Sequence, residues 1–378
     1  RKFSTSGSLM VAKILNLIQN SFPIQERPFA VLADKTGLSE GEAIHRIKEL
    51  KKRGIIRRIG AIFDSRSLGY SSTLVAMRVP SPRVEEVARL VSRYPNVTHN
   101  YERDGEYNLW FTLIAESEER IRQIRGEILG ASGIQDILNL PAKNIFKIQV
   151  NFSFEEAGSR EFQEVRDTEW QTEGRIASSK TKDQAVIEDS ILSPGEETRE
   201  PFREAKSGNR KALDETEARD QFSYTQQEIN LIRWLQGDLS IEKRPFGKIA
   251  EKVGVGEETV LDMIRKMTER GIIRRFGAVL NHQEAGYKHN AMGVWQVAAR
   301  VQEVGAVMAS FPQVSHCYER PSSPQWPYNL YTMIHGHSKE ECTGIAERIS
   351  RATGVSDYRL LFSIREFKKT SMEYFNDQ

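Results

Sequence analysis

Two short stretches of the sequence place a histidine, a tyrosine and an arginine at every second position. They read "HNYER" and "HCYER", and their triplets are His99, Tyr101 and Arg103, and His316, Tyr318 and Arg320. Alternate side chains of a β-strand share one face, so each triplet would present a titratable imidazole, a phenol and a fixed cation together. A buried hydrogen-bonded network would give the same pattern in one copy. The presence of two copies favours a functional face.

Paired arginines form a second repeated motif, "GIIRRxGA". Arg57 is followed by Arg58, and Arg274 by Arg275. Because side chains alternate across a strand, we expect one arginine of each pair to point inward and the other to solvent. An inward guanidinium requires an anion, and it binds a carboxylate through two parallel hydrogen bonds. That carboxylate belongs either to a ligand or to a nearby glutamate of the protein, and the motif alone does not distinguish the two.

Aromatic residues follow each triplet and add flat apolar surface beside the arginines. They are Tyr107, Trp110, Trp326 and Tyr328. This combination suits a planar ligand that carries several carboxylates.

The two copies differ where a site would be affected, since Asp64-Ser65 in one corresponds to Asn281-His282 in the other. One site built from unequal halves could hold an unsymmetrical ligand in a single orientation. His282 and His316 are candidate axial ligands for a metal already held in such a ligand. The two cysteines form no CxxC pair, which excludes a disulfide framework and a zinc ribbon.

These motifs belong to a long duplication. Residues 53–70 and 270–287 share ten identities in eighteen positions at an offset of 217. Each copy predicts a helix, a short helix, a glycine turn, a second helix and a strand, which together form a winged helix-turn-helix. The order βαββαβ follows, which is ferredoxin-like and leaves one sheet face to pack on a partner. The fold class is therefore α+β.

We expect five segments along the chain. They are a winged helix-turn-helix (1–68), a ferredoxin-like domain (69–154), an acidic polar linker (155–222), a second winged helix-turn-helix (223–285) and a second ferredoxin-like domain (286–378). The linker carries 18 acidic against 11 basic side chains and has little apolar periodicity. It would allow the two copies to pair with each other or with a second chain.

Composition and charge exclude several classes of protein. No apolar run approaches the roughly 18 residues of a membrane span. Lys13 and Asn16 interrupt the apolar positions near the start, which is atypical of a secretory signal, so we expect a cytoplasmic protein. The helices that would read DNA begin with carboxylates, Glu40 in one copy and Glu257 in the other. Phosphate repels carboxylates, so we expect no DNA binding.

The second copy resembles the siroheme decarboxylases, two-component enzymes with the fold of Lrp/AsnC transcription regulators. The resemblance rests on "RGIIRRFGAVLNHxxxGY", "NAMxVW", "SHCYERP" and "WPYNLYTMIHG". The first copy is similar to the other component through "GIIRRIGA" and "HNYERDxEYNLWFTL", so the chain resembles a fusion of both.

The resemblance implies that two acetate side chains of siroheme become methyl groups in a cavity between the components. The product would be didecarboxysiroheme, for haem or haem d1 biosynthesis. The resemblance implies no separate cofactor, because the substrate carries its own iron. It is also compatible with a bound haem.

Loss of carbon dioxide would leave electron density on a carbon beside the macrocycle, and that carbon needs a proton. An arginine on the reacting carboxylate would stabilise the ground state more than the transition state, so we expect the arginines to anchor the other carboxylates. The proton would come from His316 or Tyr318 for one acetate and from His99 or Tyr101 for the other. Replacing Arg275 should mainly raise KM, and replacing His316 should mainly slow turnover.

Two other functions fit parts of the sequence. A regulator of the Lrp/AsnC kind would bind an amino acid and DNA, but the acidic helix ends and the aromatic, arginine-rich face speak against it. A non-catalytic tetrapyrrole-binding protein fits every binding residue equally well, and turnover alone distinguishes it.

Overall fold

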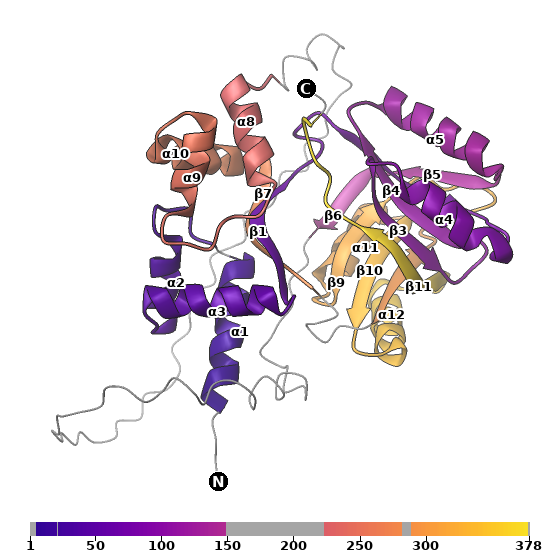
Figure 1. Ribbon diagram of the computed structural model, residues 1–378. Helices are drawn as coiled ribbons and strands as arrows, with labels where there is room; N and C mark the ends of the chain where they lie inside the picture. The colour runs from indigo at the N-terminus through magenta and orange to yellow at the C-terminus, as the bar shows by residue number, and fades with distance from the viewer. Residues whose placement is uncertain (1–4, 21, 149–222, 282–288, 377–378) are drawn as a thin grey trace, which may run out of the picture.

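The computed structural model describes residues 5–20, 22–148, 223–281 and 289–376. Helix-turn-helix elements gather on one side of the molecule, and a large sheet with its own helices lies on the other (Figure 1). This arrangement confirms the predicted α+β class and the predicted order of elements in both copies. The expected linker and His282 lie outside the described residues. Within these residues, no helix is both long and apolar enough to span a membrane.

Each copy begins with three helices and a strand. The elements of the first copy are α1 (Thr5–Asn20), α2 (Pro28–Thr36), α3 (Glu40–Lys52) and β1 (Ile56–Phe63). Those of the second are α8 (Gln226–Leu235), α9 (Pro245–Val253), α10 (Glu257–Glu269) and β7 (Ile273–Leu280). Pro28 starts α2, and the capping box predicted from Ser39 and Glu42 starts α3.

Both second helices of the helix-turn-helix carry a neutralised carboxylate at their N-terminus. Glu40 forms an ion pair with Arg27, and Glu257 forms one with Arg244. In DNA-binding members of this motif, that end of the helix approaches the base edges. Here it presents acidic side chains that the protein itself pairs with arginine.

The two wings pair with each other, because β1 and β7 form an antiparallel two-stranded sheet in which Gly60 lies opposite Gly277. A Cβ on Gly60 would lie 2.5 Å from the carbonyl oxygen of Gly237, in the second copy. A Cβ on Gly277 would lie 2.5 Å from that of Ile18, in the first. Each wing therefore packs against the backbone of the other copy at a position that only glycine fits.

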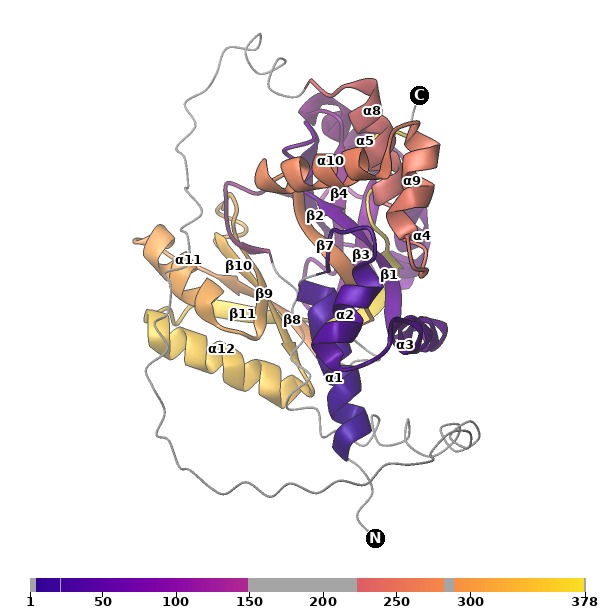
Figure 2. The same cartoon turned by 90° about the vertical axis from the view of Figure 1, so that its left-hand side faces the viewer.

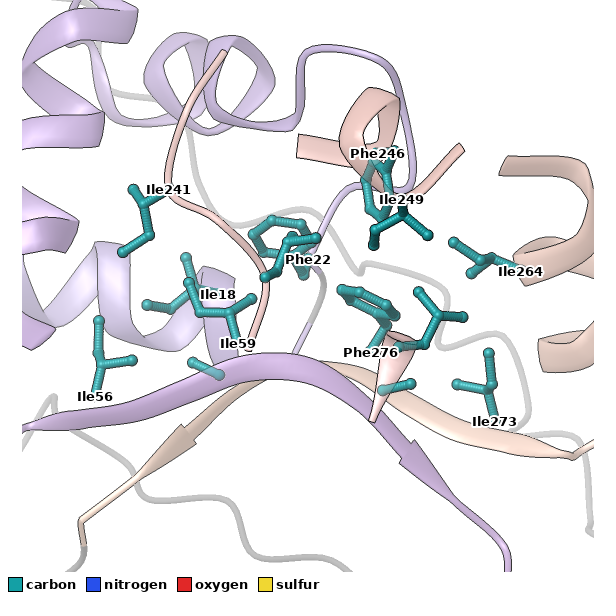
Figure 3. Close-up of a cluster of buried hydrophobic side chains, with 14 of the residues drawn as sticks. Ile18, Phe22, Ile56, Ile59, Ile241, Phe246, Ile249, Ile264, Ile273 and Phe276 are labelled. Carbon is teal, nitrogen blue, oxygen red and sulfur yellow. The ribbon is translucent and has the colours of Figure 1, made fainter. Parts of the chain in front are cut away.

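This exchange gives the two helix-turn-helix units a single apolar core. Figure 3 shows Ile18, Phe22 and Ile59 of the first copy among side chains of the second, including Phe246 and Phe276. The rings of Phe22 and Phe276 lie 5.7 Å apart between centroids. The two helix-turn-helix units and their wings therefore share one apolar core.

The second part of each copy has the predicted βαββαβ order. In the first copy the elements are β2 (Ser71–Met77), the 3-10 turn η1 (Ser81–Arg83), α4 (Val84–Ser92), β3 (Val97–Arg103), β4 (Leu109–Ala115), α5 (Glu118–Ser132), β5 (Ile137–Pro141) and an added β6 (Asn144–Ile148). In the second they are β8 (His289–Trp295), α11 (Val301–Ser310), β9 (Val314–Glu319), β10 (Leu330–Gly336), α12 (Lys339–Thr353) and β11 (Tyr358–Lys369).

These strands join into one sheet with the order β5-β2-β4-β3-β11-β8-β10-β9-β6. Strand β11 of the second copy connects the two copies, because its first half pairs with β8 and its second half pairs with β3 of the first copy. Strand β6 extends the first copy to β9 of the second in the equivalent way. The two halves therefore pair within one chain.

The helices cover the outer faces of the strands, and the helix-free faces of the two halves pack on each other (Figure 2). The core between these faces draws Trp110 and Leu140 from the first copy and Val294, Tyr331 and Leu361 from the second. The predicted packing of one copy on the other through the helix-free sheet face is therefore confirmed.

Candidate functional site

A cavity of about 490 Å³ lies where the paired wings meet the large sheet. Its walls come from β1 and β7, from β2, β3 and β4, from β6, β9 and β10, and from the segment 369–374 that follows β11. Its size falls within the range of small-molecule sites. Six arginines line it, which are Arg57, Arg58, Arg66, Arg103, Arg274 and Arg320.

Both predicted triplets line this cavity. The rings of His99 and Tyr101 stack with their centroids 6.3 Å apart, and those of His316 and Tyr318 stack at 6.1 Å. The guanidinium carbon of Arg103 lies 5.3 Å from the Tyr101 ring centroid, and that of Arg320 lies 4.7 Å from the Tyr318 ring centroid. Period-two spacing on β3 and β9 therefore produces the same stack of imidazole, phenol and guanidinium twice.

Burial makes both imidazoles weak bases. It lowers the pKa of His99 to about 4, and Lys369 adds to the effect. It also lowers the pKa of His316 to about 4, and His99 is the next largest influence, so the two rings are electrostatically coupled. Both imidazoles are therefore neutral near pH 7. An anionic ligand would favour their protonated forms.

The phenols are held in their protonated state. Burial raises the pKa of Tyr101 and that of Tyr318. The hydroxyl of Tyr101 donates a hydrogen bond of 3.0 Å to Oε2 of Glu366. Both tyrosines can serve as hydrogen-bond donors, and neither is poised to act as a phenolate.

One of the six cavity arginines forms an ion pair with a carboxylate among the described residues. Arg274 donates from Nε and Nη2 to Oδ2 of Asp64 at 2.9 and 2.6 Å, which fulfils the intramolecular alternative for this residue. For the other five, the part of the chain that the structure describes provides no ion pair with a carboxylate. Instead, Arg57 donates to the carbonyl oxygen of Lys369 at 3.1 Å, and Arg103 to that of Leu361 at 3.1 Å.

Arg103 is deeply buried and Arg320 is half-buried. Burial lowers the pKa of Arg103 to about 10 and also lowers the pKa of Arg320. Each still carries its charge at neutral pH, and Arg103 is only 4% exposed. A buried cation costs free energy unless an anion lies close to it. The cavity is therefore built to receive a ligand with several negative groups.

The arginine pairs differ from the expected alternation. Arg57 and Arg58 both line the cavity, although β1 and β7 carry equivalent bulges, beside Arg57 and beside Arg274. In the second copy Arg274 lines the cavity and Arg275 does not. Arg275 donates instead to the backbone carbonyl oxygen of Gln19 at the end of α1. It supports the packing of the wing on that helix.

The predicted aromatic walls are divided. Trp110 lines the cavity, whereas Tyr107, Trp326 and Tyr328 pack in the closed core behind it. The ring centroid of Trp326 lies 5.7 Å from that of Trp110 and 5.4 Å from that of Tyr107. These three side chains thus back the wall and do not form it.

Several cavity residues were absent from the predicted set. Tyr331 lines the cavity, and it occupies the position in "YNLY" that Trp110 occupies in "YNLW", so the alignment of the copies could have identified it. Arg66, Lys369 and Tyr374 also line the cavity. They lie in a loop and at the end of β11 or beyond it, where no repeat or periodicity marks them.

The structure does not test the two predicted axial ligands. His282 lies outside the described residues, and His316 lies in the cavity wall. The described ranges contain no cluster of three or more His, Cys, Asp or Glu side chains suited to a metal ion. Axial ligation of a substrate metal by either histidine stays a prediction.

The two halves of the cavity differ at equivalent positions. On the His99 side, β11 places Glu366 opposite Tyr101 and Lys369 opposite His99. On the other side, β6 places Ile145 opposite Tyr318 and Ile148 opposite His316. The strand beside each triplet therefore contributes charged side chains in the His99 half and aliphatic ones in the His316 half.

Family models match both parts of each copy. The AsnC-like ligand binding domain matches residues 67–147 and 284–368. The siroheme decarboxylase NirDL-like HTH domain matches residues 12–57 and 228–274. Together these matches cover most of the chain outside the expected linker.

Known proteins resemble the chain either over nearly its full length or over a part of it. The siroheme decarboxylase of Hydrogenobacter thermophilus is 36% identical over 97% of this chain and 95% of its own. The siroheme decarboxylase beta subunit of Methanosarcina barkeri is 45% identical over 38% of this chain and 96% of its own. A crystal structure of the siroheme decarboxylase NirDL in complex with an iron-uroporphyrin III analogue superposes with a TM-score of 0.64 at 31% identity, covering 97% of this chain and 94% of that one. The chain therefore belongs to the siroheme decarboxylase family.

Proposed function

We propose that this protein removes carbon dioxide from two acetate side chains of siroheme and forms didecarboxysiroheme. The observation that carries the proposal is the set of five cavity arginines without a carboxylate partner among the described residues, of which Arg103 is deeply buried. A tetrapyrrole rimmed with carboxylates matches that charge. The ligand named for the related NirDL complex, an iron-uroporphyrin III analogue, has the same chemical character.

In this reaction the bond between the acetate methylene and its carboxylate breaks. The electron pair stays on the methylene carbon, where the macrocycle delocalises it, and a proton then completes the methyl group. The arginines contribute by holding the carboxylates that do not react, because a guanidinium on the reacting one would stabilise the ground state most. We assign this role to Arg57, Arg103 and Arg320.

The proton donors are His316 or Tyr318 in one half and His99 or Tyr101 in the other. All four line the cavity, and each half holds an imidazole stacked on a phenol. The aliphatic wall of Ile145 and Ile148 makes the His316 half the drier one, which disfavours the charged carboxylate and favours its loss as neutral carbon dioxide.

His316 cannot serve as proton donor and iron ligand at the same time. Its Nδ1 lies 2.8 Å from the hydroxyl of Ser315, so Nε2 is the nitrogen that serves the cavity in either role. We assign it to proton donation, and a ligand-field spectrum of the bound substrate tests the choice. An iron–imidazole signature lost on His316→Gln would reverse it.

Anaerobic incubation with siroheme tests the function directly. We expect mass spectra to show the loss of two carbon dioxide units, and absorbance titration to show saturable binding. Saturable binding without any loss of carbon dioxide would identify a tetrapyrrole-binding protein in place of an enzyme.

A further inference from the structure

A second histidine is connected to His316 through one hydroxyl group. The Oγ atom of Ser315 lies 2.8 Å from Nδ1 of His316 and 2.8 Å from Nε2 of His335. Ser315 is buried, and His335 is half-buried near the end of β10. A weaker contact of 3.4 Å links the same hydroxyl to the carbonyl oxygen of Met333. The three side chains form a continuous path from the cavity wall toward the end of the strand.

The pairing of β9 with β10 explains this geometry. Met333 pairs with His316 and Ile334 pairs with Val314, so Ser315 is an extra residue on β9. A bulge of this kind redirects a side chain away from the regular alternation. Here it places the Ser315 hydroxyl between the two imidazoles.

The chemistry of a buried imidazole gives this path a purpose. Burial keeps His316 neutral, with a pKa of about 4. A neutral ring that gives up its Nε2 proton becomes an imidazolate unless Nδ1 receives a proton in the same step. Each decarboxylation consumes one proton, so the half-site needs a supply at Nδ1.

We propose that His335 supplies this proton through Ser315 when His316 protonates the substrate carbon. As carbon dioxide leaves, the carbon takes the proton from Nε2 of His316. Nδ1 of His316 takes the hydroxyl proton of Ser315, and that hydroxyl is restored from Nε2 of His335, which carries a proton on both ring nitrogens before the step and is neutral after it. After the product leaves, the half-buried His335 regains its proton by exchange with solvent, and His316 returns to its first tautomer. The net step consumes one carboxylate and one solvent proton and yields a methyl group and carbon dioxide.

The first copy provides a natural comparison. Thr98 lies 3.0 Å from Nδ1 of His99 through its Oγ1 atom, so the hydroxyl is present. Ile114 occupies the position of His335, and the path ends there. The relay therefore serves only the His316 half. In this scheme His335 is a positioning residue, since it acts on the substrate through His316.

The inference rests on the proposed function, and matched variants test it. His335→Ile installs the residue of the first copy, Ser315→Ala breaks the path and Ser315→Thr keeps the hydroxyl. His337→Gln changes an exposed histidine two positions further on and serves as the control. Single-turnover reactions with siroheme, in water and in deuterium oxide, would follow the species that have lost one and two carbon dioxide units.

We expect His335→Ile and Ser315→Ala to slow one of the two losses by about 10²-fold, the lower end of the range for a general acid. The product lacking one carbon dioxide should accumulate, and the solvent isotope effect on that step should change. Siroheme affinity should stay within about twofold, because neither side chain holds a carboxylate. Ser315→Thr should recover most of the rate that Ser315→Ala loses, His337→Gln should behave as the unmodified protein, and added imidazole should partly restore His335→Ile.

The relay would be overturned if His335→Ile released both carbon dioxide units at equal rates. It would also be overturned if this variant reacted more slowly with an unchanged solvent isotope effect and without rescue by imidazole. If the unmodified protein itself released no carbon dioxide, the proposed function would fail instead. Nitrogen-15 spectra of the histidine rings separate the two results without turnover. We expect His335→Ile to shift the tautomer balance of His316, and unchanged His316 signals would contradict the hydrogen-bonded path.

Discussion

The two halves of the cavity descend from one repeated unit, yet they present different chemistry at equivalent positions. His99 and Tyr101 face Lys369 and Glu366 across β3 and β11. Their counterparts His316 and Tyr318 face isoleucines across β9 and β6. The triplet is the repeated part of the site, and the strand beside it determines how polar each half is.

The arginines show a second difference. Asp64 neutralises Arg274, while the equivalent position near Arg57 is Asn281. The backbone amides of Asp64 and Asn281 make matching hydrogen bonds across the wings, which confirms that the two positions correspond. The half with the charged wall thus also has the unneutralised arginine. We therefore expect carboxylate binding to depend more on Arg57 than on Arg274.

Removing an imidazole should have the largest effect. His316→Gln is expected to lower kcat by about 10²- to 10⁴-fold with little change in KM, because the lost group acts on the transition state. His99→Gln should do the same to the other acetate, so the two variants should accumulate isomeric products that lack one carbon dioxide. Mass spectrometry with chromatographic separation checks this. A single shared product would show that both acetates react in one half.

The folded protein should lose stability in mild acid through both halves. An unfolded histidine binds a proton below about pH 6.5, while His99 and His316 bind one only near pH 4. As pH falls through this window the unfolded state gains protons first, so the free energy of unfolding decreases, by at most about 3 kcal/mol per histidine. Urea unfolding midpoints from pH 7 to pH 4 measure the decrease. His99→Gln and His316→Gln should each remove the part of this stability decrease that comes from its own half. If the decrease were the same in both variants as in the unmodified protein, the burial effect would be contradicted.

Arginine variants should separate binding from chemistry. Arg57→Ala is expected to raise KM by about tenfold or more with kcat nearly unchanged, because a hydrogen bond to a charged group contributes about 1.5–3 kcal/mol. Arg274→Ala should do less, since Asp64 already neutralises that guanidinium. Steady-state kinetics with siroheme measures both.

Two further variants control this comparison. Asn281→Asp gives the first half the carboxylate of the second and should weaken binding. Arg275→Ala should leave KM unchanged, because the side chain bonds to Gln19 outside the cavity. A large rise in KM for Arg275→Ala would restore the role predicted from the motif.

The smallest effect should come from exchanging the wall residues. Glu366→Ile removes the acceptor of the Tyr101 hydroxyl and makes the first half resemble the second. A buried hydrogen bond to a charged group contributes about 1.5–3 kcal/mol to stability, and a partly exposed one contributes less. We therefore expect Glu366→Ile to change one decarboxylation rate by a few-fold. Rapid-quench measurement of the two losses checks it. Equal changes in both losses would show that the halves are not independent.

The sequence predicted the fold well because each signal was local and repeated. The capping residues, the glycine turns and the period-two triplets all specify short-range geometry, and the duplication showed which elements recur. The predicted triplets accordingly meet in one cavity.

What the sequence did not predict depends on long-range pairing. Arg57 and Arg58 both line the cavity, whereas only Arg274 of the second pair does, and no local pattern marks this difference. Trp326 enters the core between the halves, although the segment that carries it has the composition of a binding loop. The walls that distinguish the halves come from β6 and β11, whose partners lie in the opposite copy.

Strand β11 is hydrogen-bonded to both copies at once, and each wing packs on the other copy's backbone. Separate polypeptides of this kind could also associate like with like and form assemblies with two identical halves. Covalent connection raises the local concentration of the complementary partner and favours the mixed pairing. The chain therefore assembles one asymmetric reaction chamber per molecule, independent of how much protein a cell contains.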